Sequence, residues 1–336
     1  MRNTIAAGDV PSACFGCREV LTPDSMPKTR TPAPGTGIPK LSFITTCKGR
    51  LANLKVSLPR MAVQEEAEVI LVDYDCPDGA GAWVSENFPY TQVVSVKDAP
   101  IFNVSRARNL GATQARGRWL CFIDADTLLD ARFSAQALPL LEKGAFYLIA
   151  NPKPDAFGTV ICLHDDFVAL GGYDEVLQGY GAEDRDFYIR LTLLGRRHQN
   201  LPGEWVQTIA HDRAASVRYY EIQDHRLNQR INATYVQIKH DLTRQFGGTA
   251  LPPATRQMVY AEVSRALQHA VATAQPRARV AVTLPTDLVV RLYGWQIKRV
   301  WTYLIEPLPR QPAPGPSVVA GGIPGWRTGA ADEVAE

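Results

Sequence analysis

The feature that most constrains the fold is a series of short apolar runs that alternate with longer amphipathic segments from residue 41 onward. The runs are LSFITT (41–46), EVILVD (68–73), QVVSV (92–96) and WLCFID (119–124). The segments between and after them, 49–63, 78–86, 103–115 and 131–142, are typical of helices, with Asp78 and Asn103 as predicted N-caps. Strands and helices that take turns in this way predict an open α/β sheet flanked by helices.

The pattern changes beyond residue 146. We expect short strands at 146–149, 159–163 and 204–209, a helix at 183–194, and further helices at 216–245, 254–274 and 285–304. The sequence therefore predicts a Pro-rich N-terminal arm (1–40), an α/β domain (41–215), a mainly helical C-terminal region (216–306) and a Pro/Gly/Ala-rich tail (307–336).

The composition excludes several classes of protein. The chain has 336 residues with 36 Lys+Arg, 34 Asp+Glu and a formal charge of +2, so we expect neither a disordered protein nor a nucleic-acid partner. No apolar run reaches the roughly 18 residues of a membrane-spanning helix. Without a secretory pattern we expect a cytoplasmic protein with reduced cysteines, in which Cys14 and Cys17 have the spacing of half a zinc site.

Two aspartates, Asp124 and Asp126, follow the fourth apolar run. Side chains at i and i+2 of a strand share one face, and carboxylates are hard oxygen ligands for Mg²⁺ or Mn²⁺. An ion held here would neutralise the diphosphate of a leaving group. A solvated turn after the strand is the alternative interpretation of so short a motif.

A second acidic group, Glu183 and Asp184, stands where the loop GYGA enters a helix. The helix dipole favours the ionised form there, so either carboxylate is a candidate base, or only a helix cap. Tyr180 is suited to stacking on a sugar or to simple packing. His211, after the run WVQTIA, is suited to completing an ion site with Asp126 or to a structural role.

Taken in order, these motifs resemble a GT-A-fold glycosyltransferase of the family 2 type, with a second half similar to the β-1,4-galactosyltransferase and chondroitin-polymerase group. The stretch SRARNLGATQARGRWLCFIDAD is the closest single match, and LGGYDEVLQGYGAEDRDFYIRL resembles the acceptor loop of the family, with Tyr180 in place of the usual Trp. The resemblance covers about 41–215. It implies a Rossmann-like mixed sheet flanked by helices, followed here by the helical extension.

The resemblance also implies roles for individual residues. Asp184 would be the catalytic base, with Glu183, Tyr180 and Gly181 holding the acceptor. Asp126 and His211 would hold Mn²⁺ or Mg²⁺. The nucleotide-sugar would contact Thr45, Thr46, Lys48, Arg50, Asp73, Arg106, Asn109 and Asp124.

The expected activity is inverting, metal-dependent transfer of a sugar from a nucleotide-sugar, a UDP-sugar by preference, to a hydroxyl group. The acceptor stays open between a saccharide, a lipid-linked molecule, a peptide and a small molecule. In the retaining polypeptide N-acetylgalactosaminyltransferases the acidic pair reads Glu-Asn and the metal motif Asp-x-His, so Glu183-Asp184 and Asp124-x-Asp126 favour inversion. A non-catalytic nucleotide-sugar-binding subunit is the other alternative, and it would lack a metal or base residue.

The segment LVVRLYGWQIKRVWTYLI is rich in aromatic and basic residues. Trp295 and Trp301 stand among Arg291, Lys298 and Arg299, a mixture typical of interfacial helices. A helix over 285–304 would therefore contact the inner face of a membrane, or pack against the catalytic core or a second subunit of a homo-oligomer.

Overall fold

We describe the fold on a computed structural model, which covers residues 37–150, 158–210, 217–248, 250–283, 291–292, 295–296 and 299–307. Most of the predicted arm, with Cys14 and Cys17, lies outside the described residues. So do the predicted metal ligand His211 and all but the first residue of the predicted tail.

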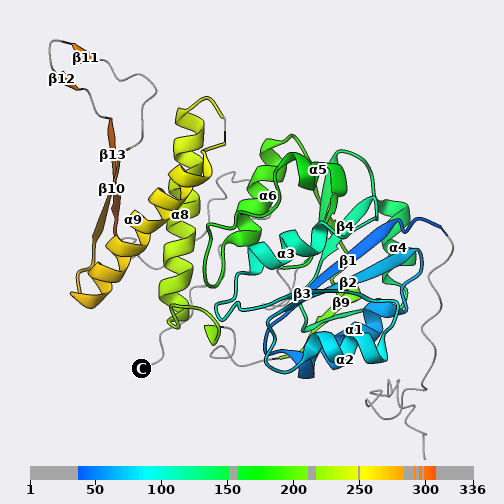
Figure 1. Cartoon of the computed structure of the whole chain (residues 1–336). Coiled ribbons are helices and arrows are strands. Elements are labelled where there is room, and N and C mark those ends of the chain that lie inside the picture. Colours follow the sequence, from blue (N-terminus) through cyan, green and yellow to red (C-terminus); the bar gives the residue numbers. More distant parts are fainter. Residues whose placement is uncertain are drawn as a thin grey trace, which may run out of the picture.

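A seven-stranded mixed sheet forms the centre of the α/β part (Figure 1). Its strands are β1 (Leu41–Cys47), β2 (Ala67–Tyr74), β3 (Gln92–Val96), β4 (Trp119–Phe122), β6 (Ala145–Ile149), β7 (Val160–Leu163) and β8 (Arg197–Leu201). The order is β3-β2-β1-β4-β7-β6-β8, in which β3, β2, β1 and β4 are parallel and β7 is antiparallel to β4 and β6. The predicted mixed α/β sheet is confirmed.

Helices cover both faces of this sheet. They are α1 (Leu51–Ala62), α2 (Ala80–Asn87), α3 (Val104–Ala112), α4 (Phe133–Ala137) with the 3-10 turn η1 (Leu138–Leu140), α5 (His164–Ala169) and α6 (Glu183–Leu193). Phe43 of β1 packs in the same cluster as Leu58 of α1, whereas its neighbour Ile44 packs with Phe187 of α6 on the other face. Burial on both sides explains why β1 is a continuous apolar run.

Smaller elements complete the α/β part. β5 (Thr127–Leu129) pairs with β9 (Val206–Thr208), which follows the 3-10 turn η2 (Gly203–Trp205). The N-cap predicted at Asn103 is confirmed, because its side chain accepts a hydrogen bond of 2.8 Å from the N–H of Arg106. The N-cap predicted at Asp78 is wrong: α2 begins after Gly79, whose left-handed backbone (φ 71°) suits glycine.

The C-terminal region consists of two helices and an antiparallel hairpin. α8 (His225–Gln245) packs against α9 (Pro253–Ala272), and α9 packs against β10 (Ala278–Thr283), which pairs with β13 (Val300–Ile305). Figure 1 shows the two helices between the hairpin and the α/β part. Their apolar cluster also includes Leu177 from the loop before α6, so the extension is packed against the α/β part.

The helix predicted over 285–304 is wrong. The described residues of this segment form β11 (Arg291–Leu292), β12 (Trp295–Gln296) and β13. In β13, Trp301 and Tyr303 are half-buried, whereas Val300 and Leu304 are exposed, which is the period of two that a strand requires. The described residues of this segment therefore form no interfacial helix, and the membrane contact expected for the segment stays a prediction. Among the described residues no helix is long and apolar enough to cross a membrane.

Candidate active site

Arg108 of α3 joins the two acidic motifs. Its side chain is only 3% exposed, and its Nη1 lies 2.6 Å from Asp184 Oδ1 and 3.5 Å from Glu183 Oε1. Its Nη2 lies 3.0 Å from Asp124 Oδ1. One guanidinium thus connects the end of β4 with the first turn of α6, and it brings together three of the predicted site residues. Arg108 itself was not predicted as a site residue, although it stands within the stretch that best matches the family.

Burial controls the protonation of the acidic pair. The side chains of Glu183 and Asp184 are 12% and 19% exposed. Burial raises the pKa of Asp184 well above its usual range and outweighs the opposing charge of Arg108, and it also raises the pKa of Glu183. The helix dipole was expected to favour the ionised carboxylates, but loss of water has the larger effect. A carboxylate with a raised pKa is a stronger base once it has ionised.

Asp126, the predicted metal ligand, lies beside Arg50. Its Oδ2 is 3.7 Å from Arg50 Nη1, and its carbonyl accepts a 2.8 Å hydrogen bond from the N–H of Ile209. The chain therefore passes Asp126 two residues before His211. Carboxylates of Asp126 and Asp124 suit a hard cation such as Mg²⁺ or Mn²⁺. Within the described ranges, however, no cluster of three or more His, Cys, Asp or Glu side chains could by itself hold a metal ion.

Gly158, just before β7, lies against the Arg108–Asp124 pair. A Cβ at this position would lie 2.4 Å from Asp124 Oδ2 and 3.0 Å from Arg108 Nη2. Such contacts are far shorter than van der Waals distances, so only glycine allows the backbone to approach the pair this closely.

Two predicted nucleotide contacts hold the loops after β1 and β2. Lys48 Nζ donates to the carbonyls of Tyr74, Asp75 and Ala99 at 3.2, 3.0 and 2.8 Å. The carboxylate of Asp73 accepts 2.8 Å hydrogen bonds from the N–H groups of Cys76 and Gly81. Both side chains are buried and shape the loops in which a nucleotide would lie. Direct contact with the nucleotide stays a prediction.

The other predicted nucleotide contacts occupy three different settings. Thr45 and Thr46 are buried at the end of β1, and Arg106 is exposed on α3. Asn109 bonds the backbone of Tyr173, accepting from its N–H at 2.8 Å and donating to its carbonyl at 3.0 Å. Asn109 thus orients the loop that leads to α6. Among the described residues, its side-chain hydrogen bonds go to Tyr173 and Glu175, and none of them goes to Asp124.

A cysteine pair connects the same two loops. Cys76 Sγ lies 3.8 Å from Cys47 Sγ and accepts a 3.2 Å hydrogen bond from the N–H of Gly49. The Cys47 thiol and the surrounding N–H groups outweigh the effect of burial and lower the pKa of Cys76 to about 6. Cys76 is therefore largely a thiolate at neutral pH.

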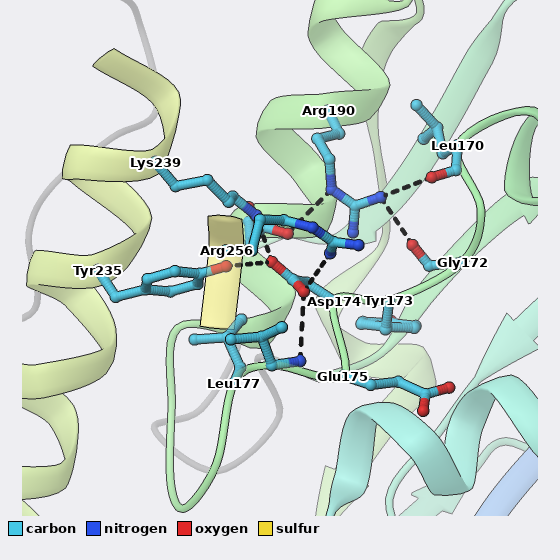
Figure 2. A network of polar contacts seen from close by, with 12 residues as sticks. Leu170, Gly172, Tyr173, Asp174, Glu175, Leu177, Arg190, Tyr235, Lys239 and Arg256 are labelled. Atoms are coloured by element: carbon cyan, nitrogen blue, oxygen red, sulfur yellow. Dashed lines mark hydrogen bonds and ion pairs between the residues drawn. The ribbon is translucent and has the colours of Figure 1, made fainter. Parts of the chain in front are cut away.

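The predicted acceptor loop is anchored by buried charges (Figure 2). Asp174 Oδ2 accepts hydrogen bonds of 2.8 Å from Tyr235 and 2.9 Å from Lys239 on α8, and Oδ1 pairs with Arg256 on α9. Asp186 on α6 pairs with Lys239, His240 and Arg190. These residues form what we call the anchor network: Asp174, Asp186, Arg190, Tyr235, Lys239, His240 and Arg256. The sequence analysis did not predict it.

Tyr180 and Gly181 lie against the start of α8. The Tyr180 ring packs on the His225 ring with centroids 4.3 Å apart, and Asn232 Nδ2 donates to the Gly181 carbonyl at 2.9 Å. The backbone of Gly181 is left-handed (φ 89°). The loop is therefore fixed on α8, and a contact between Tyr180 and an acceptor stays a prediction.

A family model matches part of this chain. The model of the family "Glycosyl transferase family 2" matches residues 42–180, which include both aspartates of the Asp-x-Asp motif, Arg108 and Tyr180. No curated protein matches the chain at a significant level.

Several solved structures are similar at low identity. TarS 1–349 of S. aureus is 16% identical, over 67% of this chain and 71% of that chain, with a TM-score of 0.46. The mannosyltransferase PcManGT of Pyrobaculum calidifontis, in complex with GDP-Man and Mn²⁺, is 18% identical over 75% and 80%, with a TM-score of 0.47. The catalytic domain of Drosophila β1,4-galactosyltransferase 7 is 17% identical over 52% and 72%, with a TM-score of 0.39. From the family match we conclude that the α/β part of this chain, matched over residues 42–180, is a glycosyltransferase domain of the family 2 type, with the Asp-x-Asp motif after β4 of its mixed sheet.

Proposed function

We propose that this enzyme transfers a sugar from a UDP-sugar to an acceptor hydroxyl with inversion at the anomeric carbon, and that it requires a divalent metal ion. The observation that carries this proposal is the Arg108 bridge between Asp124 and Asp184. It joins the motif expected to meet the donor with the carboxylate expected to activate the acceptor. An intact acidic pair also distinguishes the chain from a subunit that only binds nucleotide-sugar.

In the proposed step, Asp184 accepts the proton of the acceptor hydroxyl. The acceptor oxygen forms a bond to the anomeric carbon while the bond from that carbon to the diphosphate oxygen breaks, and the nucleoside diphosphate leaves with the electron pair. The raised pKa of Asp184 supports this role, because the carboxylate is then basic enough to compete for the proton. Arg108 holds Asp184 in place and limits the rise of its pKa.

Asp126, with Asp124 nearby and His211 two residues after Ile209, would hold the metal ion. When bound, such an ion neutralises negative charge that develops on the leaving diphosphate. Arg50, 3.7 Å from Asp126, adds a positive charge on the same side of the site. The loops shaped by Lys48 and Asp73 would hold the nucleoside.

Calorimetric titration of UDP, GDP and CDP, with Mn²⁺ and again with EDTA, tests the donor and metal assignments. We expect UDP to bind in the presence of Mn²⁺ and to lose its affinity in EDTA. Equal affinity in EDTA would remove the metal assignment, and stronger binding of GDP or CDP would remove the UDP assignment. Transfer of a labelled sugar with retained configuration would overturn inversion.

Substitution Asp184→Asn tests the base. Turnover is measured by UDP-sugar hydrolysis or by transfer, and general-base loss lowers it by about 10²–10⁴-fold. UDP affinity should be unchanged. Asp165→Asn, which changes an exposed carboxylate on α5, is the matched control and should keep both the turnover and the UDP affinity of the wild type. A joint loss of UDP binding and turnover in Asp184→Asn would make Asp184 a structural residue.

A further inference from the structure

A groove of about 570 Å³ lies between the acceptor loop and α9. One wall is the loop segment that includes Glu175 and Gln178, and the other is the face of α9 that carries Gln257, Ser264 and Gln268. We propose that this groove binds a neutral saccharide chain, namely the sugar units of an acceptor beyond the one at Asp184. The inference rests on the proposed function and names the class of acceptor that the function left open.

The groove is continuous with the candidate active site along the chain. The wall segment runs from Gln178 through Gly179 and Gly181 to Glu183 and Asp184 at the start of α6. Asp184 lies six positions after Gln178, which corresponds to at most about 20 Å of extended chain. Gln178 and Asp184 are therefore no farther apart than this, and in the proposal a saccharide chain with its end at Asp184 follows this loop to the groove.

The wall is rigid before any ligand binds. Tyr260 donates a 3.1 Å hydrogen bond to the Gln178 carbonyl, and Asn103 Nδ2 donates a 3.0 Å hydrogen bond to the Glu175 carbonyl. The neighbouring Asp174 is held by the anchor network. Preformed walls of this kind are typical of ligand sites, because little conformational entropy is lost on binding.

The lining suits hydroxyl groups rather than phosphates or acyl chains. Within the described part of the chain, the side-chain amides of Gln178 and Gln257 make no hydrogen bond, so both can donate to and accept from a ligand. Gln268 Nε2 donates to Ser264 Oγ at 2.8 Å, which leaves its amide oxygen as an acceptor.

Charge adds to this selectivity. Arg265 supplies a positive charge to the lining, but it is paired with Glu262, and the Glu175 carboxylate already accepts a 2.8 Å hydrogen bond from Asn109. The lining therefore offers no surplus of positive charge for an anionic polymer. Val176 and Ala261 add apolar side chains to the lining, against which the C–H face of a sugar ring can pack.

The experiment measures binding of cellohexaose, maltohexaose, xylohexaose and chitohexaose to the full chain by saturation-transfer NMR and calorimetry. Oligogalacturonate is the anionic probe. Ala261→Trp fills the groove from an exposed helix position, and Ala272→Trp makes the same change at the exposed end of α9, outside the groove. UDP affinity with Mn²⁺ is measured in parallel on all three proteins.

We expect at least one neutral hexasaccharide to bind the wild type and Ala272→Trp equally, and Ala261→Trp at least about tenfold more weakly. UDP affinity should be the same in all three. The proposal is overturned if no neutral hexasaccharide binds, if oligogalacturonate binds more tightly, or if Ala261→Trp binds as the wild type does. Saccharide binding without UDP binding would support saccharide binding in the groove and reject the proposed function. UDP binding without saccharide binding would support the donor site of the proposed function and reject saccharide binding in the groove.

Discussion

The central sheet and the C-terminal helices are held in place by different interactions. The faces of the sheet are covered by apolar side chains, such as Phe43 and Leu58 on one side and Ile44 and Phe187 on the other, each fully buried. Where α8 and α9 meet the acceptor loop, the buried groups include charged ones, above all Asp174 and Lys239. Apolar packing tolerates changes that conserve volume, whereas a buried ion pair requires both partners. The position of the predicted acceptor loop therefore depends on buried ion pairs, which tolerate fewer substitutions than apolar packing does.

The largest expected effect comes from breaking the anchor network. Asp174→Ala removes the carboxylate that pairs with Arg256 and one of the two carboxylates that pair with Lys239, which costs about 3–5 kcal/mol of stability. Leu58→Ala, the matching change on helix α1 where it covers the sheet, costs about 2–5 kcal/mol through lost burial and a cavity. Urea titration gives both values, with Asp165→Ala as the exposed control. A loss below about 1 kcal/mol for Asp174→Ala would contradict the importance of the network.

A pH series separates the two kinds of interaction. Burial alone would raise the pKa of Asp174, but Lys239 and Arg256 outweigh it and hold the pKa below the usual range. The stability that this ionised group contributes is present above its unfolded pKa of about 3.9 and is lost as pH falls through the folded value. We therefore expect the penalty of Asp174→Asn to stay constant from about pH 7 to pH 4 and to shrink as the pH falls further, whereas that of Leu58→Ala stays constant throughout. A constant penalty for both would contradict the prediction.

The smallest expected effect concerns chemistry at the loops of the sheet and not stability. The rate of Cys76 alkylation by iodoacetamide should reach half its maximum near pH 6, because the thiolate is the reactive form. Cys47→Ala removes the main cause of the lowered pKa and should move this midpoint upward by more than about one pH unit. Mass spectrometry of peptides identifies the labelled cysteine, and the buried Cys121 and Cys162 should stay unlabelled in the folded protein. An unchanged midpoint would contradict the assigned cause.

The sequence predicted the sheet because its strands are local. Runs such as 41–46 and 68–73 are apolar throughout, and the structure has β1 and β2 there. The hairpin was missed because the aromatic and basic residues around Trp301 suggested a helix; the alternation in burial from Val300 to Ile305 is seen only in the structure. The sequence around Gly158 also gave no sign that its backbone lies against the Asp124 side chain.

Site residues that stand in short sequence motifs were predicted, whereas residues that act through partners far away in the sequence were missed. Asp124 and Asp184 were predicted from their motifs and lie together in the structure, but the bridge that joins them depends on a contact of Arg108 with Asp184, 76 positions later. Asp174 likewise meets Lys239 65 positions away, and no spacing in the sequence reveals such a pair. Lys48 and Asp73 lie in the predicted loops, where they hold backbone groups, a function that residue type alone does not disclose.

The Arg108 bridge has a consequence for how the enzyme would respond to substrate. Its guanidinium is oriented by three carboxylates in the folded chain alone, with its charge shielded from water. Dipoles and charges that are already aligned need little reorganisation as a reaction proceeds, and reorganisation is a large part of the barrier for the same reaction in water. Under the proposed function, folding would thus align Asp124 and Asp184 in advance, and a substrate would meet a polar environment that is already set.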